Sequence, residues 1–376
     1  MVISILPGFL TVVLGAPPIF LGLMDGVADA LASFWKIVSG WFSDKIRRRK
    51  IIAVSGYSLS VIARSLLVLV GNFWQVLAIR MVDRVGKGTR EAPRDALLAE
   101  SVSESEVGKS FGYQRAMDTM GAVLGSLAAI LIFGATQNYR LLFFISFLVG
   151  TLAVASFLFV REVKAWNDGP KDTPRKLSFS VRGFPNYFKL FILAVFIFGL
   201  GTMPLSLMLL KVKDIMPGSV AYIPVMYFVY SLSFAVFAIP FGKFSDRIGK
   251  RKVIAGGFLV AIIAYLIFAN LSTLISVYAG FILFGLHSAM TDGILRAKAS
   301  RLVGIEALAQ GEGFLGASLG VSSLLAGLVG GTIWTLWGQS AAFTYGAGMM
   351  AIGLILFLYW NGFWNRHKGF EMNKVN

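Results

Sequence analysis

A succession of apolar segments, each about as long as a membrane crossing, dominates the sequence. A helix needs about 20 mostly apolar residues to cross a bilayer, and eleven segments qualify. Apolar residues make up 56% of the chain and charged residues 14%, which excludes a disordered chain and an ordinary soluble enzyme. We expect an all-α integral membrane protein surrounded by a lipid bilayer. The expected spans are Pro18–Phe42, Ile51–Val70, Phe73–Leu98, Gly108–Gly134, Leu141–Val160, Tyr187–Leu210, Val220–Phe241, Val253–Ala269, Leu274–Ala299, Ala307–Trp334 and Ala341–Phe363.

One further apolar piece, Met1–Gly15, precedes these spans and is too short to cross a bilayer alone. It has no basic start and no cleavage site of small residues, so it lacks the features of a signal peptide. We expect it to be a truncated first helix. The alternative is a short helix that tilts or lies at the membrane interface.

Basic residues are concentrated in alternate connections between the spans. The chain has 35 Lys and Arg against 19 Asp and Glu, a formal net charge of +16. Basic residues cluster after Phe42, Val160 and Phe241 and in the tail, whereas the other connections have none except Lys211 and Lys213. Cytoplasmic loops collect Lys and Arg, so we expect these turns and the C-terminus to be cytoplasmic. The charge then reports topology, and we expect no nucleic acid partner.

The sequence contains an internal repeat. The segment Gly40–Lys50 recurs as Gly242–Lys252, at an offset of 202 residues. Each copy follows the second helix of one half of the chain. Repeats of this kind predict two six-helix bundles in parallel repeat, formed by 1–160 and 187–376. The polar, proline-containing stretch 161–186 is expected to be a cytoplasmic linker.

Both copies resemble the signature turn of the major facilitator superfamily, Gly-x-x-x-Asp-(Arg/Lys)-x-Gly-(Arg/Lys)-(Arg/Lys). The second copy matches better, because Arg47 occupies the position of the family glycine in the first. The resemblance implies that Asp44 approaches the start of the eleventh helix as part of a cytoplasmic latch; the alternative is an Asp that only caps its turn. The residues to which we assign a gating role are Gly40, Asp44, Arg48, Gly242, Asp246, Arg247 and Gly249.

A second resemblance lies on the fourth expected helix. Arg80-x-x-Asp83 is similar to the Arg-x-x-Gln-Gly of the family, although Asp83 and Arg84 depart from Gln and Gly. The run 83–97 resembles a prokaryotic branch of the superfamily. The resemblance implies the major facilitator fold, a place in the cytoplasmic (inner) membrane of a prokaryote, and secondary transport by alternating access.

Charges segregate to one side of this fourth helix. At 100° per residue, the eight charges of 80–95 fall within an arc of roughly 140°. Charged groups that face lipid are costly, so we expect this side to face a water-filled cavity. The alternative is a helix that ends near Val85 and continues as a solvated loop. The charged residues are Arg80, Asp83, Arg84, Lys87, Arg90, Glu91, Arg94 and Asp95.

The five positive and three negative charges of this stripe give a surplus of +2, which favours an anionic substrate. The spacing predicts that Lys87 pairs with Asp83 and with Glu91. An internal network of ion pairs that only holds helices together is the alternative. The candidate substrate-binding residues are Arg80, Asp83, Arg84, Lys87 and Arg115.

Carboxylates within the other expected spans are candidate proton carriers. They are Asp25, Asp29, Asp118 and Asp292. We prefer Asp29 and Asp118. Asp29 would be disqualified if it paired permanently with Lys36 or with an arginine of the cavity.

These observations favour a proton-coupled secondary transporter of a small polar, anionic solute. Efflux of amphipathic drugs is an alternative, which the charged stripe disfavours. A membrane sensor or scaffold without transport is an alternative of another class, and it predicts permanently paired charges. Only His287 and His367 are available, there is no Cys, and no nucleophile or metal-ligand spacing is found. We expect no enzyme activity, no cofactor, no metal and a monomer.

Overall fold

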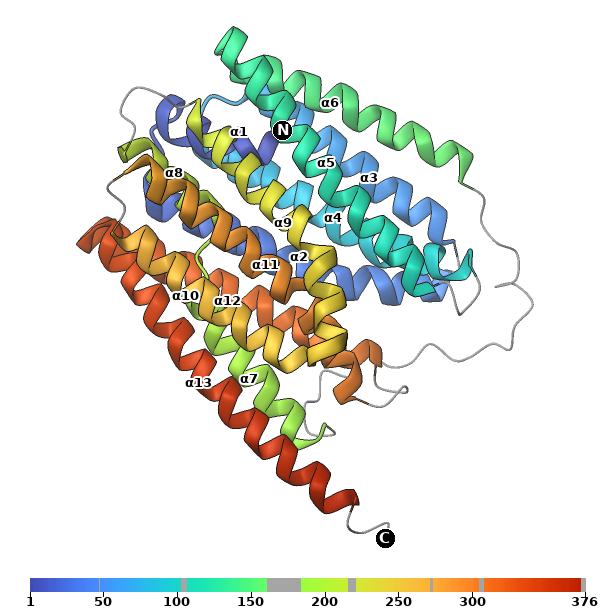
Figure 1. Ribbon diagram of the computed structural model, residues 1–376. Helices are drawn as coiled ribbons and strands as arrows, with labels where there is room; N and C mark the ends of the chain where they lie inside the picture. Colours follow the sequence, from blue (N-terminus) through green and yellow to red (C-terminus); the bar gives the residue numbers. More distant parts are fainter. Residues whose placement is uncertain are drawn as a thin grey trace. The chain divides into compact units, whose positions relative to one another are not determined.

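The computed structural model describes residues 1–46, 48–102, 107–160, 184–215, 221–270, 273–303 and 308–372 (Figure 1). Within these ranges all regular secondary structure is helical. Ten helices of the described part are long and apolar enough to cross a membrane. Most of the expected linker, residues 161–183, lies outside the described residues.

The chain forms two compact units. Unit 1 consists of Met1–Pro17, Val27–Ser178 and Ile223–Val225, and unit 2 consists of Pro18–Gly26, Phe179–Tyr222 and Met226–Asn376. Within unit 1, α3 packs against α4 on one side and α6 on another. The helices that supply unit 1 are α1 (Val2–Gly8, continued as a π-helical turn Phe9–Val13), α2 (Pro18–Ile46), α3 (Arg49–Ser65), α4 (Phe73–Glu100), α5 (Val107–Thr136) and α6 (Tyr139–Ser156).

Unit 2 is built around α13, which runs alongside α7 and α10 (Figure 1). Its buried core is rich in large aromatic side chains, among them Phe191, Phe258, Phe343 and Trp360. The helices of this unit are α7 (Asn186–Gly201), α8 (Leu205–Ile215), α9 (Tyr222–Ile248), α10 (Lys250–Ala269), α11 (Leu274–Leu302), α12 (Leu308–Trp337) and α13 (Gln339–Met372).

The expected spans coincide with helices of the structure to within a few residues at most ends. The exception is Tyr187–Leu210, which we predicted as one helix; it is interrupted between Gly201 and Leu205. Pro204 disfavours the helical conformation of the residue before it, so the first helix ends here. The backbone N–H of Met203 donates to Tyr265 Oη at 2.7 Å, which satisfies a donor that the break leaves without an intrahelical partner.

Lys211 was an exception to the charge pattern of the connections. The structure places it within α8, where it is 4% exposed. Its Nζ lies 5.3 Å from the centre of the Phe343 ring, a cation–π distance. The lysine is therefore part of a helix rather than of a solvated connection, and so it does not belong in a count of loop charges.

Candidate functional site

The fourth helix, α4, continues through the whole charged segment. Asn72 begins it with a capping box, in which its Oδ1 accepts from the Gln75 N–H at 3.0 Å. The helix ends only at Glu100, so the alternative of a loop beginning near Val85 is wrong. Trp74, Met81 and Val82, on the side opposite the charges, are exposed.

Asp83 lies at the buried end of the charged stripe, between two arginines. Its Oδ1 accepts from Arg64 Nε at 3.0 Å, and its Oδ2 lies 3.6 Å from Arg80 Nη1. The side chains of Asp83 and Arg80 are 3% and 6% exposed. We predicted Lys87 as the partner of Asp83 from their spacing on one helix. That prediction is wrong, because Arg64 on α3 and Arg80 one turn earlier occupy the carboxylate.

Ser60 on α3 connects the backbone of Asp83 to the side chain of Arg90. Ser60 Oγ donates to the backbone oxygen of Asp83 at 3.1 Å and accepts from Arg90 Nη1 at 2.8 Å. The guanidinium of Arg90 also lies 4.5 Å from the centre of the Tyr57 ring. α3 and α4 come this close because α4 has a glycine at the contact. A Cβ on Gly86 would lie 2.6 Å from Ser60 Oγ, so a larger residue would hold the helices apart.

The α2 side of the stripe carries a second group of ion pairs. Arg84 Nη2 lies 3.6 Å from Asp29 Oδ1. Lys87 pairs with Glu91 at 3.6 Å, which confirms the spacing prediction. Lys36 on α2 lies 3.6 Å from Glu91 and 3.5 Å from Asp95. Asp29 thus has the arginine partner that the sequence left open.

Close contact between α2 and α4 fixes these pairs. A Cβ on Gly88 would lie 2.8 Å from Trp35 Cβ and 2.9 Å from the Ala32 carbonyl oxygen. Ser39 Oγ donates to the Gly88 carbonyl at 2.7 Å, and Trp35 Nε1 donates to Thr89 Oγ1 at 2.7 Å. The glycine removes the side chain that would hold the helices apart, and the two hydrogen bonds set their register.

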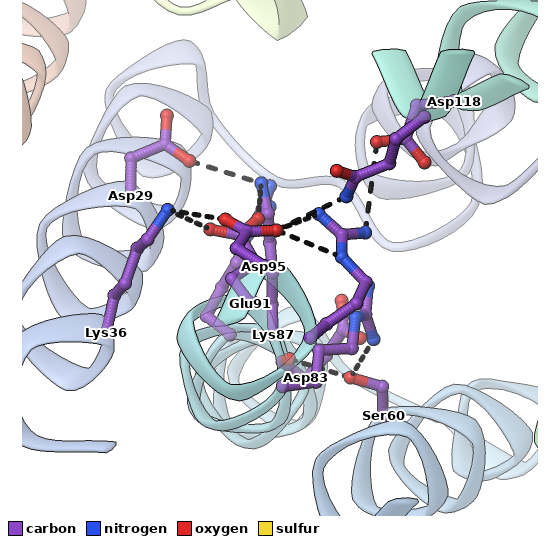
Figure 2. A network of polar contacts seen from close by, with 12 residues as sticks. Asp29, Lys36, Ser60, Asp83, Lys87, Glu91, Asp95 and Asp118 are labelled. Atoms are coloured by element: carbon purple, nitrogen blue, oxygen red, sulfur yellow. Dashed lines mark hydrogen bonds and ion pairs between the residues drawn. The ribbon is translucent and has the colours of Figure 1, made fainter. Parts of the chain in front are cut away.

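Asp118 on α5 completes the arrangement (Figure 2). Arg94 Nη2 lies 3.1 Å from Asp95 Oδ1, and Arg94 Nη1 lies 3.8 Å from Asp118 Oδ2. Gln114 Nε2 donates to Asp95 Oδ1 at 3.3 Å. Four helices, α2 to α5, therefore contribute side chains to one network within unit 1.

This network, which we call the charge network, has more cations than carboxylates. Asp83, Glu91 and Asp95 are each divided between two cations. Seven basic side chains stand against five carboxylates, a formal charge of +2. Its charged members are Lys36, Arg64, Arg80, Arg84, Lys87, Arg90, Arg94, Asp29, Asp83, Glu91, Asp95 and Asp118.

Exposure changes along the charge network. At one end the side chain of Asp83 is 3% exposed, whereas Asp29 and Asp118 are 46% and 52% exposed. The ions of the buried end are therefore held in a low-dielectric environment, where their interactions are stronger. The carboxylates of the other end are about half exposed.

Three further residues were predicted as part of the site. Arg115 is exposed on α5. Asp25 is half-buried in the first part of α2, which belongs to unit 2. Asp292 is half-buried on α11 of unit 2.

The sequence analysis missed the contribution of α3. Tyr57, Ser60 and Arg64 recur at intervals of three and four residues, which places them on one face of that helix. A polar face on an otherwise apolar span was a usable signal. It was overlooked because the segment has fewer charges than its neighbour.

The signature turns connect successive helices, α2 to α3 and α9 to α10. Gly249 has φ +96°, a conformation that favours glycine, and Lys250 Nζ lies 2.6 Å from Asp246 Oδ1. Arg48 and Arg247 are exposed and Gly242 is half-buried. A Cβ on Gly40 would contact Ala92 Cβ at 3.4 Å. The latch partner of Asp44 was expected at the start of the span Ala307–Trp334, which is the eleventh helix when Met1–Gly15 is counted as the first. That start, the side chain of Asp44 and Arg47 lie outside the described residues.

Metal binding has no obvious location in the part of the chain that the structure describes. Among those residues, no group of three or more His, Asp or Glu side chains is arranged to hold a metal ion. His287 is buried and its Nδ1 lies 2.9 Å from the Gly257 carbonyl oxygen. A satisfied core histidine of this kind has a packing role.

The helical architecture with ten candidate spans in its described part is that of a multi-pass membrane protein. The sequence profile of the Major Facilitator Superfamily matches residues 1–216 and 191–366, and the chain belongs to this family. It is 32% identical over 367 residues to the "Uncharacterized MFS-type transporter MJ1317" of Methanocaldococcus jannaschii, an alignment that covers 96% of this chain and 90% of that protein.

Solved transporters share the fold. A point mutant of the nucleoside transporter NupG superposes with a TM-score of 0.79 at 13% identity, over 96% of this chain and 95% of that one. The peptide transporter POT in complex with sulfate superposes with a TM-score of 0.76 at 13% identity, over 96% and 90%. At these identities the likeness shows the fold alone.

Proposed function

We propose that this transporter is a secondary active carrier of a small polar, anionic solute across the cytoplasmic membrane of a prokaryote. It works as a monomer by alternating access, with its basic turns and C-terminus in the cytoplasm. The observation that carries the anionic substrate is the division of three carboxylates, Asp83, Glu91 and Asp95, between two cations each. Their charge does not neutralise the cations around them.

Arg80 and Arg84 are the proposed contacts with the anion, and Asp83, Lys87 and Arg115 are the further candidates. The two arginine side chains are 6% and 12% exposed, so water screens their charge poorly. A guanidinium can bind a carboxylate or a phosphate through two parallel hydrogen bonds. A solute with such a group would be attracted by the surplus positive charge of the charge network.

Protons are the proposed coupling ion, with Asp29 and Asp118 as the preferred carriers and Asp25 and Asp292 as the others. Asp29 keeps this role only if its pair with Arg84 breaks during transport, since a permanent pair would disqualify it. Each preferred carboxylate faces one arginine of the network, at 3.6 Å and 3.8 Å, and about half of its side chain is exposed. Protonation from water would weaken its contact with that arginine. Proton uptake and movement of α4 relative to α2 or α5 would thereby be linked.

Uptake into proteoliposomes tests the proposal. The panel contains labelled carboxylates, phosphate and sulfate, a neutral sugar and a cationic dye. We expect uptake of one or more anions only, stimulated by an imposed pH gradient. Arg80→Gln and Arg84→Gln should lower it at least about tenfold, the loss of roughly one charge-assisted hydrogen bond. Arg140→Gln, which removes an exposed arginine of α6 outside the network, should leave it unchanged.

The other outcomes separate the alternatives. Uptake of the dye without any anion would support drug efflux. Anion uptake that ignores the pH gradient would remove the proton as coupling ion. A sensor or scaffold is the second candidate, because every charged residue of α4 between 80 and 95 has a polar or aromatic contact. Absence of flux for the whole panel would support it.

A further inference from the structure

Two basic side chains of unit 2 share one tryptophan. The guanidinium of Arg251 on α10 lies 5.3 Å from the centre of the Trp360 ring, and Lys298 Nζ on α11 lies 5.6 Å from it. Arg251 is half-buried and Lys298 is 9% exposed. Both distances are those of cation–π contacts, so two positive charges lie beside one aromatic ring.

Trp360 is fixed in place. It is fully buried, and its Nε1 donates to the backbone oxygen of Tyr187 on α7 at 2.7 Å. Phe191 and Phe357 lie 5.2 Å and 5.1 Å from it between ring centres. The ring therefore holds both cations at a defined position where α7, α10, α11 and α13 meet.

Four candidate membrane spans begin or end at this position. Tyr187 and Arg251 are the second residues of the candidate spans Asn186–Lys213 and Lys250–Ala269. Lys298 is the last residue but one of the span Leu274–Ala299, and Trp360 is the last residue of the span Gln339–Trp360. Four spans thus end at one level. Trp and Tyr gather at the level of lipid headgroups, which is also the depth of the lipid phosphates.

We propose that Arg251 and Lys298, held in place by Trp360, form a binding site for the phosphate headgroup of an anionic phospholipid. Basic pockets between helix ends bind such headgroups, and the cations here are at the right depth. About two turns along α10 from Arg251, Leu259 is 51% exposed, which leaves apolar surface for an acyl chain on the same helix. The site lies outside the charge network, and its role does not depend on the transported solute.

Titration of phosphatidylglycerol into the purified protein in zwitterionic micelles tests the site, with the melting temperature as readout. Phosphatidylglycerol should raise the melting temperature, whereas phosphatidylcholine should not. One basic residue near an anionic lipid surface contributes about 1 kcal/mol. Arg251→Gln and Lys298→Gln should each raise the apparent dissociation constant about fivefold, and the double variant about 30-fold. Arg296→Gln removes an exposed charge from the same helix and should change it less than about twofold.

Brominated lipids give a second readout that needs no loss of charge. The chain has eight tryptophans, so the Trp360 signal is the difference between the parent and Trp360→Phe. Brominated phosphatidylglycerol should quench this Trp360 fluorescence, and brominated phosphatidylcholine should not.

Three results would overturn the proposal. The first is a loss of lipid affinity in Arg296→Gln as large as in Arg251→Gln, which would indicate diffuse attraction. The others are equal quenching by both lipids and an equal rise of the melting temperature with millimolar inorganic phosphate. The last would assign the site to free phosphate.

Discussion

Asp83→Asn removes the charge from the buried end of the network while preserving the size of the side chain. Loss of one partner of a buried ion pair costs about 3–5 kcal/mol, because the remaining charge stays buried. That range applies to the pair of Asp83 with Arg80, because these two side chains are only 3% and 6% exposed. Arg64 is 36% exposed, so its pair with Asp83 contributes only about 0–1 kcal/mol to the free energy of unfolding. We expect the free energy of unfolding to fall by about 3–5 kcal/mol.

Denaturant titration in detergent micelles, followed by tryptophan fluorescence and circular dichroism, measures this loss. Asp118→Asn is the matched control, since that side chain is 52% exposed and lies 3.8 Å from Arg94. It should cost less than about 1 kcal/mol. The double variant Arg80→Gln/Asp83→Asn removes both charges and should recover much of the stability, because coupled partners are not additive. An Asp83→Asn protein as stable as the control, or a double variant that loses the sum of the two single losses, would refute the reasoning.

Three further predictions concern backbone and packing, each measured by the same titration. Gly88→Ala should cost about 1–3 kcal/mol because its Cβ would overlap Trp35 and Ala32; Gly121→Ala, which meets nothing within 4 Å, should be neutral or stabilising, and equal losses would count against tight α2–α4 contact. Gly249→Ala should cost about 1–2 kcal/mol because φ is +96°, and Gly242→Ala is its control; no difference between them would contradict the strain. Trp35→Phe should cost at least about 1 kcal/mol through its bond to Thr89, and Trp74→Phe, exposed on α4, should cost less.

The helices of this fold could largely be predicted from hydropathy, since a long apolar run in lipid has few alternatives to a helix. One of the eleven expected crossings, α4, is not among the ten helices apolar enough to qualify by composition. The sequence analysis counted it among the apolar segments, and the segregation of its charges to one side supported a continuous helix. The break at Met203 and Pro204 was missed because the flanking residues are apolar enough to form one continuous run.

The partners within the site were harder to predict than its location. Spacing along one helix correctly paired Lys87 with Glu91 and wrongly paired it with Asp83. The true partner of Asp83 comes from α3, which approaches α4 where glycines meet. Such contacts depend on how two helices pack, and neither helix carries that information in its own periodicity. The roles of these residues in transport stay predictions.

The charged stripe of α4 also bears on how this helix enters the bilayer during synthesis. Its eight charges between 80 and 95 would cost roughly 2.5–3.5 kcal/mol each if they met lipid, far more than its apolar residues return. α4 cannot partition into the membrane as an independent segment. Several partners of its charges lie on α2 and α3, which the ribosome makes before α4. They are Asp29, Lys36, Ser60 and Arg64. The order of the chain therefore provides α4 with its partners before it has to leave the translocon.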